Sequence, residues 1–208
     1  MENLPKFGIL DRIRDSAPGP IKALVRLLEL LAIGLIVYLI FLPLYPYAKL
    51  YFLPPQTLNY ETATTTTGAS KSETPQKSGD RIIIKKIGVD APIIESTDEQ
   101  DGLNRGAWRL PDSSTPDKGG NTVITGHRFK YLPPNNLTFF LLNKLVKGDR
   151  IQITWQGKVY NYLVDSTKIV PAAETSILAP SAEPLLTIFT CDPIFSTKNR
   201  LVVLARPI

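Results

Sequence analysis

The 208-residue sequence contains one cysteine and one histidine, and this scarcity excludes several kinds of site. A single cysteine cannot form a disulfide within the chain. Structural zinc usually takes four Cys or His ligands, so Cys191 and His127 cannot complete such a site. No acidic segment has the spacing of an EF-hand calcium loop. We therefore expect neither a structural metal nor any other cofactor, and the sequence leaves calcium dependence undecided.

The sequence also lacks the clustered basic residues that bind nucleic acid. Its net charge is +5, yet residues 80–208 carry 16 Lys and Arg against 13 Asp and Glu, with the two signs interspersed. A phosphate-binding protein would gather its basic residues in a patch or stripe. Mixed charges of this kind are typical of a solvated surface. Nucleic acid is therefore not a predicted partner.

Charged residues are absent from residues 30–48, which read LLAIGLIVYLIFLPLYPYA. About 20 apolar residues cross a bilayer as a helix, so we predict one transmembrane helix here, in contact with membrane lipid. Pro43 and Pro46 are expected to kink or end this helix. A cleaved signal peptide would need a shorter apolar core and a small-residue cleavage site, and no such site follows Leu44.

Basic residues near this segment predict its orientation. Five Lys or Arg residues precede it, whereas Lys49 is the only one in the twenty residues that follow. The positive-inside rule therefore puts residues 1–29 in the cytoplasm and everything after residue 50 outside. The predicted location is the cell membrane, with a single span and an extracytoplasmic domain. The five preceding basic residues are Lys6, Arg12, Arg14, Lys22 and Arg26.

Residues 54–79 are rich in Thr, Ser, Pro and Gly and contain almost nothing to bury. We interpret residues 49–79 as an extracytoplasmic tether between the membrane and a folded domain. A coil of the length of residues 54–79 has a root-mean-square reach of about 28 Å, enough to lift a domain clear of the lipid headgroups. The folded domain is then residues 80–208.

Short β-branched and aromatic runs separated by turns dominate residues 80–208 and predict an all-β domain. Gln156 and Gly157 lie between two of these runs and predict a hairpin turn. Residues 136–145 are the one expected short helix in the second half of the chain. The frequent turns favour a small closed or partly closed barrel. The expected strands include residues 82–84, 122–125, 151–155, 159–164, 185–189 and 201–204.

Cys191 is a candidate nucleophile because of its position. An unpaired extracytoplasmic cysteine is either a small buried hydrophobe or a reactive thiol. Cys191 follows the apolar run 185–189 and Thr190, and the Asp192-Pro193 pair ends the expected strand after it. A position at a strand terminus favours the accessible thiol.

His127 and Arg200 are candidates for the groups that assist this thiol. A base makes a thiol a useful nucleophile by favouring thiolate, and His127 is the only imidazole, in a Gly-His turn after strand 122–125. A guanidinium can stabilise the oxyanion that forms when an amide is attacked. Arg200 lies nine residues beyond Cys191, just before strand 201–204. Taken singly, each has a structural alternative, as a hydrogen-bonded His or a salt-bridged Arg at a strand end.

The order of these residues separates families of cysteine enzymes. Papain-like enzymes place Cys before His, whereas His127 precedes Cys191 by 64 positions and no histidine follows. Caspases share the order His then Cys, but their Q-A-C-x-G signature is absent. The order His, Cys, Arg on an all-β domain behind one membrane span resembles the sortases. The motifs that carry this resemblance are TIFTC at 187–191, like T-L-x-T-C, TGH at 125–127, like x-G-H, and RLVV at 200–203, like R-L-x-V.

The resemblance to sortases covers residues 80–208 and implies an eight-stranded β-barrel with short helices. It also implies transpeptidation: Cys191 would cleave the Thr-Gly bond of a Leu-Pro-x-Thr-Gly or Leu-Ala-x-Thr-Gly sorting signal in a surface protein. The resulting thioester would be resolved by an amine of a peptidoglycan precursor or a pilin lysine. His127 would protonate the leaving amine and deprotonate the incoming one. Arg200 and Thr190 would bind the substrate and the oxyanion.

Two further features bear on the resemblance. The segment CDPIFS at 191–196 looks closest to class E sortases, and the sequence leaves classes C and D open. Residues 171–184 occupy the position of the loop that shapes the family's substrate groove.

Two other functions stay open from the sequence. One is a catalytically idle, membrane-tethered module that binds wall polymer, which the mild positive charge favours and the presence of all three candidate catalytic residues disfavours. The other is a cysteine hydrolase that gives the thioester to water and releases surface proteins, for which the same residues would serve.

Overall fold

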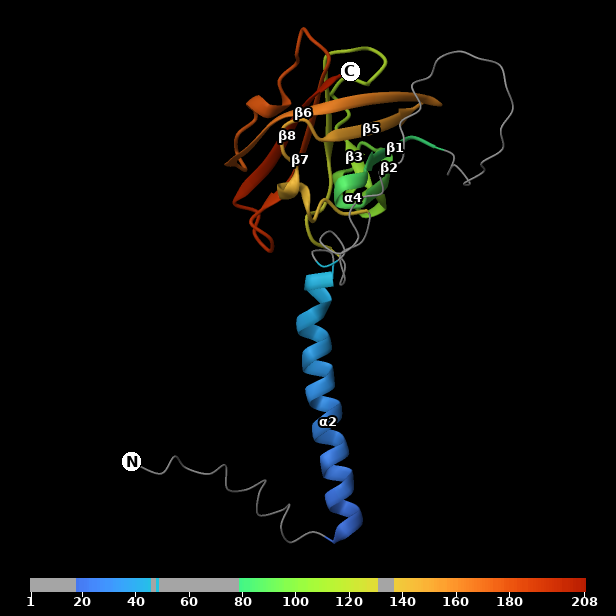
Figure 1. The fold of residues 1–208 in the computed structure, drawn as a ribbon. Coiled ribbons are helices and arrows are strands. Elements are labelled where there is room, and N and C mark those ends of the chain that lie inside the picture. The colour runs from blue at the N-terminus through green and yellow to red at the C-terminus, as the bar shows by residue number, and fades with distance from the viewer. Residues whose placement is uncertain (1–17, 46–47, 49–78, 131–136) are drawn as a thin grey trace, which may run out of the picture. The chain divides into compact units, whose positions relative to one another are not determined.

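A computed structural model describes residues 18–45, 48, 79–130 and 137–208 (Figure 1). The chain divides after Tyr45 into two compact units, which are described separately. Most of the predicted tether and of the predicted cytoplasmic segment lies outside the described residues.

The first unit contains the helix α2 (Gly19–Phe41), of 23 residues. At 1.5 Å per residue such a helix is about 34 Å long, enough to cross a bilayer. None of its residues is buried, unlike those of a core helix, and it is the one described helix long and apolar enough to span a membrane. The predicted span 30–48 overlaps its second half, but α2 begins eleven residues earlier. Its α-helical part ends before Pro43, and a 3-10 turn, Leu42–Leu44, follows.

The second unit is a closed barrel of eight strands, which confirms the predicted all-β fold. The strands follow one another around the barrel in the order β1-β2-β3-β4-β7-β8-β6-β5. Most neighbours are antiparallel, but β2 and β3 run parallel, as do β4 and β7. The strands are β1 (Arg81–Ile84), β2 (Val89–Glu95), β3 (Ala107–Arg109), β4 (Asn121–Thr125), β5 (Arg150–Trp155), β6 (Lys158–Pro171), β7 (Leu185–Asp192) and β8 (Asn199–Pro207).

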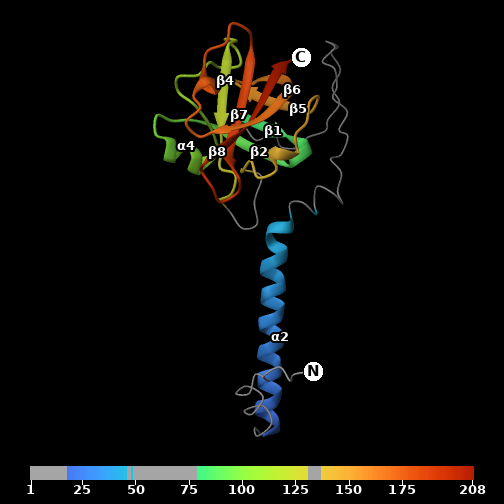
Figure 2. The same ribbon diagram turned by 90° about the vertical axis from the view of Figure 1, so that its left-hand side faces the viewer.

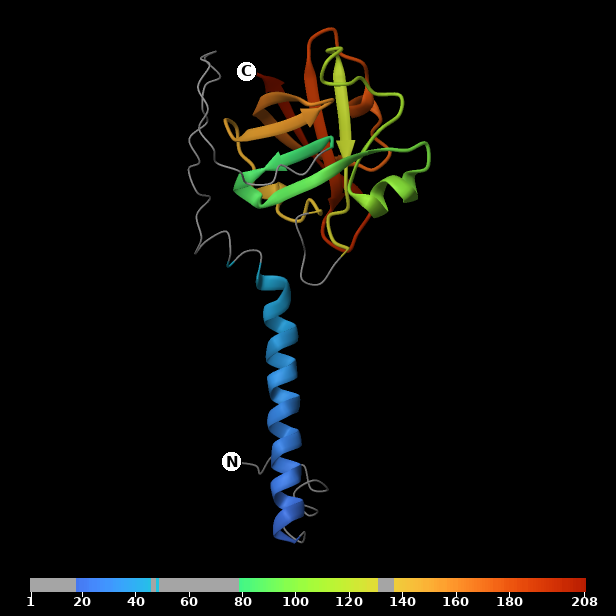
Figure 3. The ribbon, with the colours of Figure 1, turned by 90° about the vertical axis from the view of Figure 1, so that its right-hand side faces the viewer.

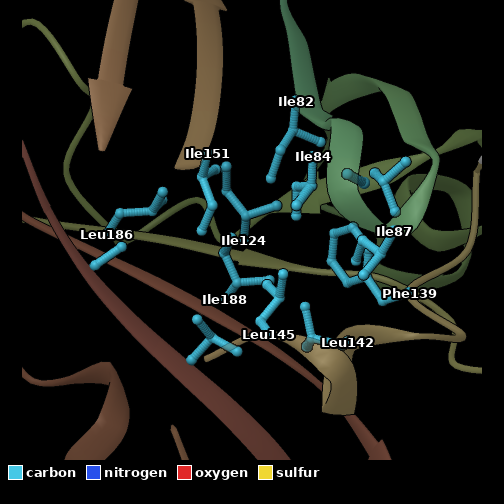
Figure 4. Packing of buried hydrophobic residues seen from close by; sticks show 14 of the residues in the cluster. Ile82, Ile84, Ile87, Ile124, Phe139, Leu142, Leu145, Ile151, Leu186 and Ile188 are labelled. Carbon is cyan, nitrogen blue, oxygen red and sulfur yellow. The ribbon is translucent and has the colours of Figure 1, made fainter. Parts of the chain in front are cut away.

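The barrel interior is filled by aliphatic side chains from most of its strands, as expected from the β-branched runs. Figure 4 shows side chains from β1, β4, β5 and β7 pointing toward one another, together with those of the β4–β5 connection. All five residues of β4 are buried, so both faces of this strand are covered. The labelled side chains are Ile82, Ile84, Ile87, Ile124, Phe139, Leu142, Leu145, Ile151, Leu186 and Ile188.

The predicted hairpin between β5 and β6 is confirmed. Trp155 pairs with Lys158, and the two residues between them, Gln156 and Gly157, both have positive φ angles, of 47° and 76°. Two positive φ angles are the signature of a type I′ turn, whose twist matches that of the flanking strands.

The helices differ from expectation. In the described part of 136–145, the only helical segment is the 3-10 turn Leu142–Lys144, because the apolar residues before it enter the core from an irregular segment. The sequence reading missed α4 (Glu99–Arg105), which packs against β2 and β3 (Figure 3). Asp98 caps α4 by accepting a hydrogen bond from the Asp101 N–H at 2.7 Å. Gly102 lies so close to the Trp108 ring that a Cβ would approach it to 2.2 Å, so only glycine fits there.

Candidate active site

Cys191 and Arg200 are paired residues on adjacent antiparallel strands. Cys191 is the penultimate residue of β7, and the register places it directly opposite Arg200 on β8. Side chains alternate along β7, so the inward-facing Thr190 is only 1 % exposed whereas Cys191 is a half-buried free thiol. The thiol is therefore not a core hydrophobe, the alternative that the sequence left open.

His127 lies level with Cys191 because β4 and β7 run parallel. Figure 2 shows β4 and β7 side by side, and their pairing ends with Thr125 beside Phe189. His127 and Cys191 each follow two residues later, so both lie at the same rim of the barrel. The backbone of His127 is fixed by its carbonyl, which accepts a hydrogen bond from the Phe139 N–H at 2.8 Å.

Gly126 allows the chain to pass close to the core just before His127. A Cβ at this position would lie 3.2 Å from the ring of Phe139, which is fully buried. That distance is shorter than ordinary van der Waals contact, and close packing leaves the ring little room to move. The glycine of the Gly-His turn therefore lets His127 follow the strand without displacing the core.

The environment of His127 favours the neutral imidazole. Burial lowers the pKa of His127 below its ordinary value of 6.5, and the charge of Lys130 lowers this pKa further. Glu99 opposes them by raising the pKa. The lowered pKa of His127 favours the neutral ring at pH 7, the form in which an imidazole can accept a proton.

Arg200 is held by backbone carbonyls rather than by a carboxylate. Its Nη1 donates to the carbonyls of Thr197 at 3.0 Å and Asn199 at 3.1 Å. Among the residues that the structure describes, Arg200 forms no salt bridge, so the ion-paired alternative is not found there. Both bonds use one nitrogen, which leaves the other guanidinium donors for a ligand.

Thr190 connects the two strands that carry His127 and Cys191. Its hydroxyl donates a hydrogen bond of 2.7 Å to the carbonyl of Gly126, inside the barrel. This contact favours a role in positioning the two strand ends over the predicted contact with substrate.

Arg128 and Asp192 are two site residues that the sequence reading missed. Arg128 Nη1 donates to Asp192 Oδ1 and, at 3.3 Å, to the carbonyl of Cys191. The ion pair is largely buried, with side-chain exposures of 6 % for Arg128 and 16 % for Asp192. In the sequence, a basic residue directly follows His127 and an acidic residue directly follows Cys191. These two charges could be paired only once the parallel register of β4 and β7 was known.

Asn121 fixes the β6–β7 loop at the opposite end of β4. Its side-chain Nδ2 donates to the carbonyls of Ile177 at 3.2 Å and Ala179 at 3.0 Å, and its Oδ1 accepts from the Thr187 hydroxyl at 2.7 Å. A cavity of about 370 Å³ lies between this loop and the β3–β4 loop. It is lined by residues at the start of β4, so it is separate from the thiol and imidazole at the other end of the strand.

Comparisons with known proteins identify the family of this chain. A family model described as the sortase domain matches residues 82–208. The chain belongs to the sortase family. It is 35 % identical over 130 residues to the sortase D of Bacillus subtilis, an alignment that covers 62 % of this chain and 61 % of that protein. This sortase therefore spans about three fifths of the length of that relative.

Solved structures of sortases share the barrel. Sortase A from Corynebacterium diphtheriae is 32 % identical with a TM-score of 0.55, over 62 % of this chain and 60 % of that one. A sortase D5 transpeptidase of Clostridium perfringens is 30 % identical with a TM-score of 0.54, over 62 % and 78 % of the two chains. The matched part corresponds to the barrel unit, so the family and the barrel fold predicted from the motifs are confirmed.

Proposed function

We propose that this sortase is a membrane-anchored cysteine transpeptidase, with Cys191 as nucleophile, His127 as acid and base, and Arg200 as oxyanion-binding group. The observation that carries the proposal is the register: Cys191 lies opposite Arg200, and His127 leaves the parallel neighbour strand at the same level. The three residues lie at or just beyond the ends of three different strands. A shared site for chemistry accounts for their convergence.

The first half of the reaction forms a thioester. Neutral His127 takes the proton of the Cys191 thiol, and the thiolate attacks the Thr carbonyl of the Thr-Gly bond. The developing oxyanion is stabilised by the Arg200 guanidinium, whose charge does not titrate in the working range. The C–N bond then breaks, and the imidazolium of His127 donates its proton to the leaving glycine amine.

The second half transfers the acyl group. An incoming amine attacks the thioester carbonyl, and His127 accepts the proton that the amine loses. The C–S bond breaks and the Cys191 thiolate leaves. The imidazolium of His127 then gives its proton to this thiolate, which restores the neutral thiol and imidazole. The same residues with water as acceptor would give hydrolysis, so the acceptor decides between transferase and hydrolase.

The proposed substrate is a surface protein with a Leu-Pro-x-Thr-Gly or Leu-Ala-x-Thr-Gly sorting signal, and the proposed acceptor is an amine of a peptidoglycan precursor or a pilin lysine. Membership of the sortase family supports this substrate class. We further propose that α2 crosses the membrane with its amino-terminal end in the cytoplasm. The barrel would then work outside the cell membrane, where such substrates are displayed.

The decisive experiment uses the full chain in detergent with sorting-signal peptides and either an oligoglycine amine or a lysine peptide as acceptor. We expect mass spectrometry to show an acyl adduct on the wild-type chain and none on Cys191→Ala. Added amine should increase ligated product at the expense of hydrolysed peptide. Acylation without any response to amine would make the protein a hydrolase. Absence of acylation across several peptides would favour the binding module.

A further inference from the structure

The segments that carry His127 and Cys191 have no backbone pairing with each other. The β4–β7 ladder ends at Thr125 and Phe189, two residues before each reactive side chain. Cys191 remains paired with β8, but His127 lies beyond the last residue of β4. The position of the imidazole relative to the thiol therefore depends on contacts between residues 126–129 and residues 190–195, together with the Phe139 hydrogen bond to the His127 backbone.

Several side-chain contacts join these two segments. The Thr190 hydroxyl donates to the Gly126 carbonyl, as described above. The Arg128–Asp192 ion pair lies one residue beyond His127 and Cys191. Farther out, the rings of Phe129 and Phe195 meet edge to face with centroids 4.6 Å apart.

The Arg128–Asp192 contact is an ion pair, and both of its side chains are largely buried. Arg128 Nη1 also donates to the carbonyl of Cys191, so the guanidinium contacts the backbone of the nucleophile itself. Its Nε is buried and has no hydrogen-bond partner among the described residues. Burial makes either charge costly without the other, so the pair holds its geometry more firmly than a surface ion pair does.

We propose that Arg128 and Asp192 are positioning residues that fix His127 beside Cys191 and keep the local charge balanced. The inference rests on the proposed function for its kinetic consequence. It adds two residues to the site that act through the thiol and the imidazole rather than by touching substrate.

The charge balance gives the proposal an electrostatic signature. Arg128→Met leaves Asp192 as an unpaired anion next to the thiol, which disfavours thiolate. Asp192→Asn leaves Arg128 as an unpaired cation, which favours thiolate. A merely structural role would not produce opposite shifts. The other charged groups that act here are Lys130 and Glu99, which act on His127, and Arg200 on β8 opposite Cys191.

The test measures the rate of Cys191 alkylation by iodoacetamide against pH, on the full chain in detergent. The protein has one cysteine, so the reaction reports this thiol alone. We expect the midpoint of the profile to fall by about one pH unit in Asp192→Asn and to rise by about one unit in Arg128→Met. The double variant Arg128→Met/Asp192→Asn, which removes both charges, should return to the wild-type midpoint.

A kinetic measurement separates positioning from charge. In the double variant we expect kcat for peptide ligation to fall at least tenfold with KM changed less than about threefold, because misplaced groups slow the chemical step more than binding. The charge-reversed variant Arg128→Asp/Asp192→Arg should recover part of this loss. Matched controls are Lys147→Met and Asp165→Asn, which break an exposed ion pair of 3.6 Å and should change neither measurement.

The outcomes are distinguishable. If the alkylation midpoint moves in the same direction in both single variants, or moves in neither, the inference is overturned. So would a double variant with wild-type kcat. If a single variant fails to fold, the double variant still decides, because removing both charges leaves no unpaired ion. If the alkylation profiles shift as expected but the wild-type chain ligates no peptide, the proposed function fails while the inference stands.

Discussion

Cys191 lies directly opposite Arg200 across the β7–β8 ladder, so the thiol and the guanidinium belong to one cross-strand pair. Cross-strand partners have Cβ atoms about 5 Å apart, so in the proposed reaction the long Arg200 side chain can reach the carbonyl that the thiol attacks. Arg200 also has no carboxylate partner among the described residues to hold it elsewhere. This relationship leads to the first prediction.

Replacing Arg200 by Ala should lower kcat by about 10²-fold, by analogy with the loss of an oxyanion donor. Arg200→Lys should recover little, because an ammonium lacks the planar fork of donors. The exposed Arg206 on the same strand provides the control, and Arg206→Ala should leave kcat unchanged. Steady-state ligation kinetics measure all three. An effect of less than threefold in Arg200→Ala would assign this residue to structure.

The single histidine allows a direct titration. Because burial and Lys130 lower the pKa of His127, its ring should become protonated only as the pH falls below 6.5. We expect Lys130→Gln to move the NMR midpoint upward and Glu99→Gln to move it downward, since these changes remove a cation and an anion respectively. The titration is best done in Cys191→Ala, where no thiol couples to the imidazole. A midpoint above 6.5 in Cys191→Ala without further changes would contradict the prediction.

Asn121 should stabilise the barrel through its three side-chain hydrogen bonds, two of which are buried. Asn121→Ala leaves the hydroxyl of Thr187 and the carbonyls of Ile177 and Ala179 without their partner. We expect the free energy of unfolding to fall by about 1–3 kcal/mol in chemical denaturation. Amide exchange in residues 172–184 should also accelerate. The exposed Asn143 serves as control, and Asn143→Ala should change neither quantity.

Membrane attachment is tested by fractionation and proteolysis. A chain lacking residues 1–45 should leave the membrane fraction, because α2 is the one described segment able to span it. A protease added outside intact cells should cut between residues 49 and 79 and release the barrel. Full protection of the barrel from external protease would reverse the proposed orientation.

The strands were predictable because their signal is local. The runs 82–84, 151–155 and 201–204 fall inside β1, β5 and β8, where β-branched side chains alternate into the core. The helix α4 was missed because Gly102 lies in its middle and weakens its intrinsic propensity. Its packing on Trp108 is a tertiary contact that no local pattern reveals.

The individual candidate residues of the site were predictable from the sequence, but the contacts that join their segments were not. Cys191, His127 and Arg200 were identifiable from uniqueness, strand ends and family motifs. The contact of Arg128 with Asp192 spans 64 positions and depends on which strands become neighbours. The apolar residues before Leu142 were predicted to form a helix, but they are apolar because they are buried in the core. A short apolar run of this kind does not distinguish a helix from an irregular buried segment.

The parallel pairing of β4 and β7 places the candidate reactive residues at one end of β4 and the β6–β7 loop at its other end. Both strands deliver their reactive residue to one rim, and the β6–β7 loop is fastened to the other end of β4 through Asn121. Under the proposed function, insertions or exchanges within residues 172–184 should therefore change which peptides are accepted while leaving the distance from imidazole to thiol unchanged. Under the proposed function, peptide preference and reactivity therefore belong to opposite ends of one strand, and a change at one end need not disturb the other.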